Sequence, residues 1–390
     1  MLAGMSSAPR ARQKHSRPSP VTRSPSTRLF GLPVPVAIGL GLSLALLLAH
    51  AGLYAFLTDD SYISFRYSRN FAHGHGLVFN PGFERVEGYT NFLWVILLAA
   101  FDAVGLAPER VANPLSLLAT AGLWLVVVVF VRRRLEEGFE WLVLVPAFAL
   151  ALTRSIAVWS TSGLETRLFE LLVISGLLRL VREVESVERG EAPRPLATLL
   201  LALSTLTRPD GLLMAACGFA MAGLYLLARR RERFIGWALR QWPFVAIVCS
   251  QYLFRRVYYG DWLPNTYYAK VGGKTWWLSG RKYFLAFAIE YGAAFWLPFL
   301  GGALVWNFRK GTPLLPLVAL AVLVPHTLYL AAIGGDHFEY RPLGVLLVLV
   351  FVLFADGARA LIATRLKLAG TLVLLGLTYI YRRLNSEMEL

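Results

Sequence analysis

Long apolar segments alternate with short polar segments along most of this 390-residue chain. Many of the apolar segments approach the ~20 residues that a helix needs to cross the hydrocarbon of a bilayer. Examples are Leu32–Leu57, Leu115–Val131, Trp141–Val158, Gly211–Ala228 and Leu343–Phe354. The pattern predicts an all-α polytopic membrane protein.

Clusters of basic residues between the apolar segments predict the direction of each crossing. Cytoplasmic loops of membrane proteins are enriched in Lys and Arg, so we expect Arg132–Arg134, Arg229–Arg233 and Arg309–Lys310 inside the cell. Alternate crossing then predicts about eleven transmembrane helices. These are Leu32–Leu57, Val111–Val131, Trp141–Trp159, Arg167–Val181, Leu196–Leu206, Leu212–Ala228, Trp237–Val257, Tyr283–Trp306, Leu314–Ile333, Leu343–Phe354 and a last helix near Leu368–Ile380.

One apolar segment does not fit the alternation. Phe92–Leu106 is hydrophobic enough to cross, but counting it as a crossing would invert every later loop. We therefore predict a partial or re-entrant helix, which a membrane protein tolerates where the helix packs on protein.

Composition supports the membrane assignment and excludes a soluble domain. Hydrophobic residues make up 56% of the chain and charged residues only 16%, which leaves too little polar side chain to cover a soluble surface. The net charge of +15 comes from the loop clusters and from a basic, Ser- and Pro-rich start, so we expect no nucleic-acid partner. Residues 1–31 are predicted to be a disordered basic cytoplasmic tail. The apolar segment that follows is too long for a cleaved signal peptide.

Six short polar motifs end the apolar segments, and alternate crossing places nearly all their acids on one side of the membrane. Charged groups are costly at membrane depth, so a chain that gathers them at one face is predicted to use them. The motifs are Thr58–Tyr62, Glu84–Asn91, Gly163–Thr166, Arg208–Gly211, Gly260–Asn265 and Gly335–Arg341. They predict an active site at the boundary between lipid and water.

The first motif begins a predicted helix that runs to about Ala72. Asp59 and Asp60 stand at its start, and Tyr62, Arg66, Arg69 and His73 share one face behind them. Ile63, Tyr67 and Phe71 form another face, which suits a helix lying on the membrane surface. A carboxylate could accept a proton here while the arginines bind phosphate oxygens. The alternative is that Asp60 only caps the helix and the arginines contact lipid headgroups.

The other motifs also have structural alternatives. Ser162 and Glu165 have the spacing of a capping box, and Arg208-Pro209-Asp210-Gly211 is a natural tight turn. The aromatic residues of the loop Tyr258–Lys282 could be interfacial anchors, or they could form a carbohydrate site with Asp261, Asn265 and Lys270. The last motif carries four ionisable candidates, Asp336, His337, Glu339 and Arg341. His337, Asp336 and Asp59 could hold a divalent cation, although no fixed ligand spacing requires one.

These motifs resemble a known family. Thr58–Tyr67, Gly74–Gly82 and Glu84–Asn91 are similar to the first extracytoplasmic loop of GT-C type glycosyltransferases, most of all the terminal β-arabinofuranosyltransferases of the mycobacterial cell wall. Gly163–Thr166, Arg208–Gly211, Leu263–Asn265 and Gly334–His337 follow in the order of that family. The final motif differs, because Asp336-His337-Phe338-Glu339-Tyr340-Arg341 stands where the family has Asp-Phe-Met-His-Gly-Arg.

The resemblance implies a GT-C transmembrane catalytic domain over residues 32–382, with 58–91 as its first extracytoplasmic loop and 383–390 as a short C-terminal tail. It implies a multi-pass protein of the bacterial inner membrane whose site faces the periplasm or exterior. The donor would be a polyprenyl-phosphate sugar and the acceptor a cell-envelope glycan, glycolipid or protein. Asp59 and Asp60 would be the catalytic acidic pair, with Asp59 as the first choice for the catalytic base, and Arg66 and Arg341 would bind the donor phosphate. Further substrate-binding candidates are Tyr62, Arg69, Glu87, Tyr89, Asn91, Glu165, Arg208, Asp210, Asn265, Lys270, Asp336, His337 and Glu339.

A transporter or flippase of lipid-linked sugars is the alternative from another class. Such a protein needs an alternating-access pathway with its charged residues near the bilayer midplane. The motifs here fall at one end of the predicted helices instead.

Overall fold

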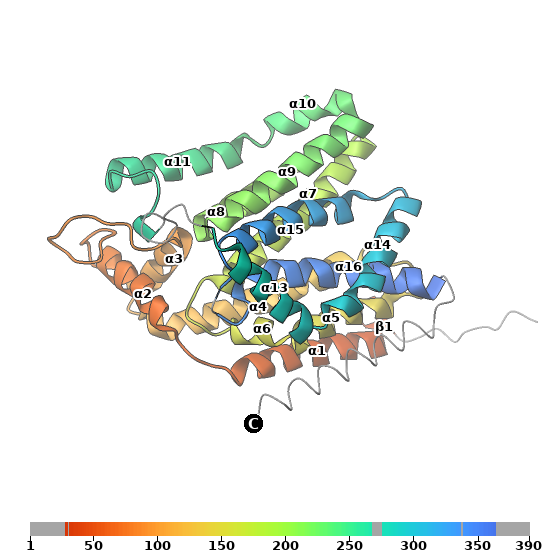
Figure 1. Cartoon of the computed structure of the whole chain (residues 1–390), viewed down its shortest axis with the longest axis horizontal. Helices are drawn as coiled ribbons and strands as arrows, with labels where there is room; N and C mark the ends of the chain where they lie inside the picture. The colour runs from red at the N-terminus through yellow and green to blue at the C-terminus, as the bar shows by residue number, and fades with distance from the viewer. Residues whose placement is uncertain (1–27, 30, 267–274, 337, 364–390) are drawn as a thin grey trace, which may run out of the picture.

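The computed structural model describes residues 28–29, 31–266, 275–336 and 338–363, which form a bundle of helices (Figure 1). Residues 1–27 of the predicted basic tail, the predicted last crossing near Leu368–Ile380 and the C-terminal tail lie outside the described residues. The end of the predicted disordered tail is ordered, because Arg28–Leu29 form a strand. In chain order the elements are β1 (Arg28–Leu29), β2 (Leu32–Pro33), α1 (Val34–Gly52), α2 (Asp59–Ala72), α3 (Phe92–Asp102), α4 (Pro108–Arg132), η1 (Glu140–Val143), α5 (Leu144–Leu152), α6 (Arg154–Val158), α7 (Thr166–Arg189), α8 (Leu196–Thr207), α9 (Asp210–Arg229), α10 (Arg231–Leu239), α11 (Trp242–Tyr258), α13 (Trp277–Glu290), η2 (Ala293–Trp296), α14 (Leu297–Arg309), α15 (Leu314–Ala332), η3 (Arg341–Leu343) and α16 (Gly344–Ala363). The two short strands pair antiparallel, with Leu29 opposite Leu32.

Five helices are long and apolar enough to cross a membrane among the residues that the structure describes. They are α1, α4, α9, α15 and the η3–α16 segment. A sixth candidate is the pair α13 and η2–α14, which is bent by 69°. Gly292 in a left-handed conformation and Pro298 in the first turn of α14 account for this break. The membrane class predicted from the sequence is confirmed, while the count of eleven crossings stays a prediction.

Three segments that we predicted as single crossings are divided in the structure. One is Tyr283–Trp306, which contains the 69° bend between α13 and η2–α14. Trp141–Trp159 becomes η1, α5 and α6, because Thr153 takes an extended conformation that ends α5. Trp237–Val257 is divided between α10 and α11, and Pro243 stands in the first turn of α11. In these last two places polar residues stand at the break, Arg154 after Thr153 and Arg240-Gln241 before α11, within segments that are otherwise mostly apolar.

Helix α3 is the segment that we expected not to cross. It has 11 residues, which gives a length of about 16 Å at 1.5 Å per residue, roughly half of the ~30 Å hydrocarbon layer. Helix α3 packs against α2 through Trp94 and Leu98, which form a small core with Phe65. Its length agrees with the prediction of a partial helix.

Helix α2 has the residue faces expected from its spacing, but of the predicted apolar face only Tyr67 is buried, while Ile63 and Phe71 are exposed. Tyr62, Arg66, Arg69 and His73 are all exposed. The buried side instead carries three serines together with Phe65 and Tyr67. Small serines allow a close approach to the neighbouring helix, so α2 is held by protein contacts. Its position on the membrane surface stays a prediction.

The two ends of the bundle differ in charge. At one end the basic ends of α4, α7, α9 and α14 lie together, and we call this the arginine end. Ion pairs join its loops, including Arg134–Glu185 at 3.2 Å, Arg229–Glu188 at 3.1 Å and Lys310–Glu136 at 3.3 Å. Helices α2 and α3 lie at the opposite end in Figure 1. The main apolar core lies between the two ends, with α16 buried along most of its length.

Candidate active site

A cavity of about 550 Å³ opens at the end of the bundle opposite the arginine end. It lies where α2, α7, α9 and η3 begin and where α8, α11 and α15 end. All six polar motifs contribute to its lining, which includes Asp60, Asn91, Glu165, Arg208, Asp210, Pro264, Asp336 and Arg341. The structure therefore brings together segments that are up to about 280 residues apart, because the helices return the chain repeatedly to the same end.

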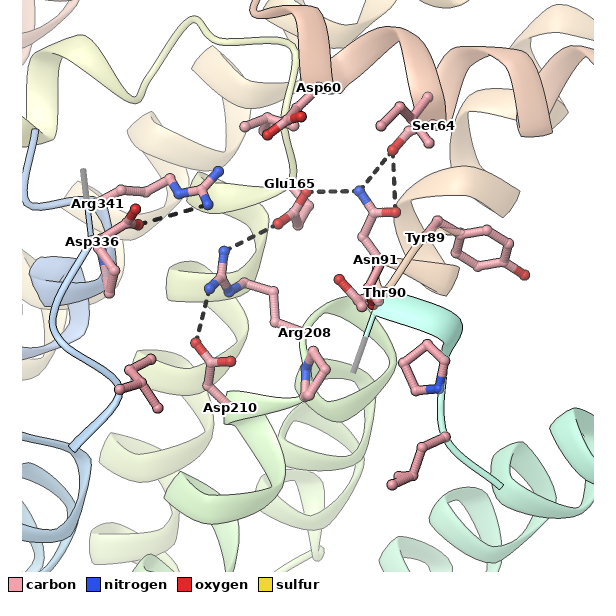
Figure 2. Close-up of a pocket in the computed structure, with 18 of the residues that line it drawn as sticks. Asp60, Ser64, Tyr89, Thr90, Asn91, Glu165, Arg208, Asp210, Asp336 and Arg341 are labelled. Atoms are coloured by element: carbon pink, nitrogen blue, oxygen red, sulfur yellow. Dashed lines mark hydrogen bonds and ion pairs between the residues drawn. The ribbon is translucent and has the colours of Figure 1, made fainter. Parts of the chain in front are cut away.

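Glu165 is the centre of the polar network in this cavity, as Figure 2 shows. Its side chain is buried, and one carboxylate oxygen accepts a hydrogen bond of 2.8 Å from Asn91 Nδ2. The other oxygen pairs with Arg208 Nη1 at 3.3 Å. Asn91 is itself held by Ser64 Oγ on α2, to which it donates at 2.9 Å. Glu165 thus joins the first loop, α7 and the end of α8.

The capping-box interpretation of Glu165 is wrong. Helix α7 has no side-chain cap hydrogen bond, and Ser162 Oγ only accepts a weak bond of 3.3 Å from Leu164 N. The Glu165 carboxylate is instead committed to Asn91 and Arg208. A glutamate at capping-box spacing can instead bind polar groups that are far away in the sequence, when these lie nearer to its carboxylate than the backbone N–H groups of the helix do.

Arg208 joins two carboxylates at the floor of the cavity. Besides Glu165, it pairs with Asp210 through Nη2 at 2.9 Å, and its guanidinium also lies over the Phe169 ring. Burial lowers the pKa of Arg208, but the nearby Asp210 and Glu165 carboxylates more than offset that effect, so its pKa is raised overall. The side chain is therefore a permanent cation. Arg208–Gly211 does make the expected turn, and the turn places both charged side chains on the cavity.

A second arginine lies across the cavity from Arg208. Arg341 pairs with Asp336 at 3.8 Å, and both side chains are 15% exposed. The Arg341 guanidinium also lies over the rings of Trp159 and Phe338. Cation–π contact and the ion pair together fix its position. Two arginines from distant helices thus face one space, which suits an anionic group such as a phosphate.

Asp60 and Asp59 have different environments. The Asp60 side chain is exposed and lines the cavity, and its carboxylate forms no hydrogen bond or ion pair with any described residue. Asp59 does not line the cavity. Its Oδ1 accepts hydrogen bonds from Thr58 Oγ1 at 3.0 Å and from the Asp60 backbone N at 2.9 Å. Of the two acids, Asp59 has the local structural role at the start of α2, and Asp60 has the free carboxylate.

Three residues of α2 that we predicted to bind substrate lie outside the cavity. Arg66 donates to Phe79 O at 2.7 Å and to Asn80 Oδ1 at 2.6 Å, and its guanidinium stacks over the Phe79 ring. Arg69 forms an ion pair with Glu109 of α4. Tyr62 packs against Phe65 and is half exposed. They share a face of α2 that is turned away from Asp60, so the structure gives them roles in holding the first loop and α4.

The segment Glu84–Asn91 is tied to α2 and α11 by side chains. Tyr67 OH donates to Val86 O at 2.6 Å and accepts from Gly88 N at 2.9 Å. Tyr89 OH and Tyr259 OH are 3.1 Å apart. Asn265, which we predicted to touch substrate, is exposed, and its backbone N donates to Glu87 O at 3.1 Å. These contacts place Tyr89 and Asn91 on the cavity wall.

Arg255 is a cavity residue that the sequence analysis missed. It lines the cavity from the end of α11, and its Nε donates to the buried Glu87 carboxylate at 3.0 Å. Burial raises the pKa of Glu87, and Arg255 lowers it only in part. Arg255-Arg256 stands at the end of a predicted outward crossing, where the positive-inside rule does not expect arginines. That exception was the signal available in the sequence.

The remaining candidates lie beside the cavity or outside the described residues. Glu339 does not line the cavity; it pairs with Arg154 at 3.4 Å, and its backbone oxygen accepts from Trp159 Nε1 at 2.9 Å. Lys270 and His337 lie outside the described residues. In the part of the chain that is described, no group of three or more His, Cys, Asp or Glu side chains could hold a metal ion.

Comparison with known proteins gives two relatives. The chain is 30% identical over 341 residues to a terminal β-(1→2)-arabinofuranosyltransferase of Corynebacterium glutamicum, covering 75% of this chain and 48% of that protein. It is also 30% identical over 339 residues to a terminal β-(1→2)-arabinofuranosyltransferase of Mycobacterium tuberculosis, covering 77% of this chain and 51% of that protein. The chain thus spans about half the length of these relatives. No protein-family model matches it, and no solved structure does.

Proposed function

This chain is related to the terminal β-(1→2)-arabinofuranosyltransferases over three quarters of its length, and from that premise we propose that it is an integral-membrane glycosyltransferase of the GT-C type. It moves a sugar from a polyprenyl-phosphate donor to a cell-envelope glycan, glycolipid or protein. The observation that carries the proposal is the cavity, in which the free carboxylate of Asp60 faces the arginines that gather around Glu165 and Asp336.

The arrangement suggests how the residues act. Asp60 accepts the proton of an acceptor hydroxyl as its oxygen attacks the anomeric carbon of the donor sugar. The bond between that carbon and the phosphate oxygen breaks, and the electron pair leaves with the polyprenyl phosphate. Arg341 and Arg208 stabilise the charge that grows on the departing phosphate, an effect that is strongest in a cavity of low dielectric. Asp336 and Glu165 orient the two guanidinium groups.

Asp60 takes the role that we first assigned to Asp59. A base needs a carboxylate that is within reach of the substrate and is not occupied by other donors. Asp60 meets both conditions, whereas Asp59 Oδ1 already accepts two hydrogen bonds. Arg341 keeps its proposed role as a phosphate ligand, and Arg208 and Arg255 replace Arg66 as the further cations at the site.

The distribution of charge supports an active site on the extracytoplasmic face of the bacterial inner membrane. The arginine end would face the cytoplasm by the positive-inside rule, which puts the cavity on the other side. Because the cavity lies at helix ends, the lipid carrier would enter it sideways from the outer leaflet. A divalent cation stays an untested prediction. The described carboxylates do not form a metal site by themselves, so we assign no step to a metal.

The test is a transfer assay with purified protein in liposomes, using a panel of polyprenyl-phosphate donors labelled in the sugar. We expect label to move to an added glycan acceptor in wild type and to stay on the donor when Asp60 is replaced by Asn. Transport without chemistry, the alternative from the sequence, predicts that unchanged donor crosses the bilayer in both proteins. That result would overturn the proposed function.

A further inference from the structure

A second cavity lies near the arginine end of the bundle, far from the candidate active site. It is a groove of about 340 Å³ with α4 and α8 as its walls and α7 as its floor. Its lining is almost wholly apolar and consists of Leu125, Val126, Val129, Phe130, Ser175, Leu178, Leu196 and Leu200, together with Arg179 and Arg182. Leu125 and Leu196 on the two walls are 54% and 45% exposed, so the groove opens to the outside of the bundle.

The groove is a separate site from the catalytic cavity. Helix α7 begins at Thr166, next to Glu165 in the cavity, and Arg182 lies sixteen residues farther along the same helix. At 1.5 Å per residue this separation is about 24 Å. A phosphate held at Arg182 therefore cannot be the one that reacts beside Asp60. The inference drawn here does not depend on the proposed function.

Positive charge at the end of the groove is only partly neutralised. Arg179 pairs with Glu183 at 2.8 Å, and Arg134 pairs with Glu185 at 3.2 Å. Arg182 and the exposed Arg133 form no ion pair with the residues that the structure describes. Arg133, Arg134 and Arg179 repel the charge of Arg182, and Glu185 partly offsets that repulsion.

Arg182 is also incompletely hydrogen-bonded. Its guanidinium lies 4.8 Å from the centre of the Phe130 ring, at the end of the groove. The Nη2 atom is buried and has no hydrogen-bond partner among the described residues. Buried guanidinium N–H groups without an acceptor are unfavourable. An anionic oxygen placed at the end of the groove would supply the missing acceptor and the missing charge.

We infer that this groove binds an anionic phospholipid of the membrane. An acyl chain would lie along the apolar lining, and the phosphate would sit between Arg182 and Arg133. The apolar walls would accept any lipid tail, but the excess cationic charge selects a headgroup with net negative charge. A phospholipid fits the location because the groove opens sideways at the depth where α4 ends.

The test is lipid binding to the full chain in detergent, measured by native mass spectrometry. Phosphatidylglycerol is titrated against phosphatidylcholine with the same acyl chains. Wild type should bind phosphatidylglycerol about 25-fold more tightly than phosphatidylcholine, because each of the two arginines near an anionic headgroup contributes about a factor of five. Arg182→Gln should lose about fivefold, and Arg133→Gln with Arg182→Gln about 25-fold in total. Arg309→Gln, at the same end but outside the groove, should bind like wild type.

A second variant tests the groove itself and not only its charge. Ser175→Phe fills the floor of the groove, so it should weaken binding of both lipids while leaving the arginines in place. Leu118→Phe is the matched control, because Leu118 is an exposed residue of α4 that does not line the groove. Equal binding of the two lipids by wild type, or unchanged phosphatidylglycerol binding by the double arginine variant, would overturn the assignment. So would an unaffected Ser175→Phe, or tighter binding of polyprenyl phosphate than of phosphatidylglycerol.

Discussion

Exchanging the two neighbouring acids of α2 one at a time should separate catalysis from helix structure. We expect Asp60→Asn to abolish most sugar transfer and Asp59→Asn to leave it nearly intact. The two side chains are adjacent in sequence and have the same charge. They differ in position, because Asp60 lines the cavity and Asp59 accepts hydrogen bonds from Thr58 and from the Asp60 backbone.

The size of each effect follows from these contacts. A positioned general base contributes roughly 10²- to 10⁴-fold to a rate, which is about 2.7–5.4 kcal/mol at 1.36 kcal/mol per factor of ten. Asparagine cannot accept the proton, so Asp60→Asn should lose turnover in this range. In Asp59→Asn the amide oxygen still accepts both hydrogen bonds. Only the favourable interaction of a carboxylate with the helix N-terminus is lost, at about 0.3–1 kcal/mol, so turnover should stay within about fivefold of wild type.

The assay is initial rate of label transfer at saturating donor, with both variants adjusted to the same amount of folded protein by size-exclusion chromatography. Asp60→Glu is a useful companion, since it keeps the carboxylate but displaces it. We expect it to retain measurable activity that Asp60→Asn lacks. The reasoning is refuted if Asp59→Asn loses turnover a hundredfold or more, or if Asp60→Asn stays within fivefold of wild type.

Three further changes test the site and its support. Arg208→Met should lower turnover by roughly 10²- to 10³-fold, as loss of one stabilising donor in a low-dielectric site does, and a normal rate at saturating donor would show that the leaving phosphate lies elsewhere. Gly163→Ala should lower the free energy of unfolding by about 1–3 kcal/mol, which would be measured as inactivation at a lower temperature. Gly163 has a φ of 76°, and an added Cβ would lie 2.8 Å from Leu57 and 2.9 Å from Ser61. Gly105→Ala is its control, with a φ of 85° and open space around it, and an equal loss in both variants would mean that the contact with α2 is unimportant. Burial raises the folded-state pKa of Glu87 above its ordinary value, which means that the folded protein favours the protonated carboxyl. This contribution to the free energy of unfolding is present at acidic pH and is lost as pH rises through the folded-state pKa. Glu87→Gln should flatten the fall in thermal stability as pH rises above the ordinary glutamate pKa of 4.5, and an unchanged profile would contradict the assignment.

Much of the helical framework could be predicted because hydropathy is a local property of the sequence. The apolar runs predicted α1, α4, α9, α15 and α16 as crossings. Alternate crossing with the arginine clusters on one side predicted that α3 is only a partial helix, in agreement with its 11 residues. The breaks at Thr153 and before α11 were missed, although Arg154 and Arg240-Gln241 stand there, because the longer apolar segments around these few polar residues suggested single crossings.

The sequence could also predict that the six motifs meet at one end of the bundle. It could not predict which hydrogen bonds and ion pairs their residues form. Alternate crossing put all six motifs at one end, and the structure brings every one of them to the same cavity. Neighbouring residues on a helix point about 100° apart, so a small rotation decides which acid faces the cavity. Sequence analysis therefore favoured Asp59 and Arg66, while the packed structure presents Asp60 and turns Arg66 toward Asn80.

The sequence by itself determined the membrane class, the gathering of the arginine clusters at one end of the bundle and the end where polar chemistry gathers, because these follow from transfer of side chains between water and lipid. Only the tertiary structure decided which charged side chains form ion pairs or hydrogen bonds within the protein and which remain available to a substrate. Glu165 is bound by Asn91 and Arg208, Glu87 by Arg255, and Arg69 by Glu109. Each of these pairs joins residues at least 40 positions apart. The energy of such a contact depends on distances that arise only once the helices pack.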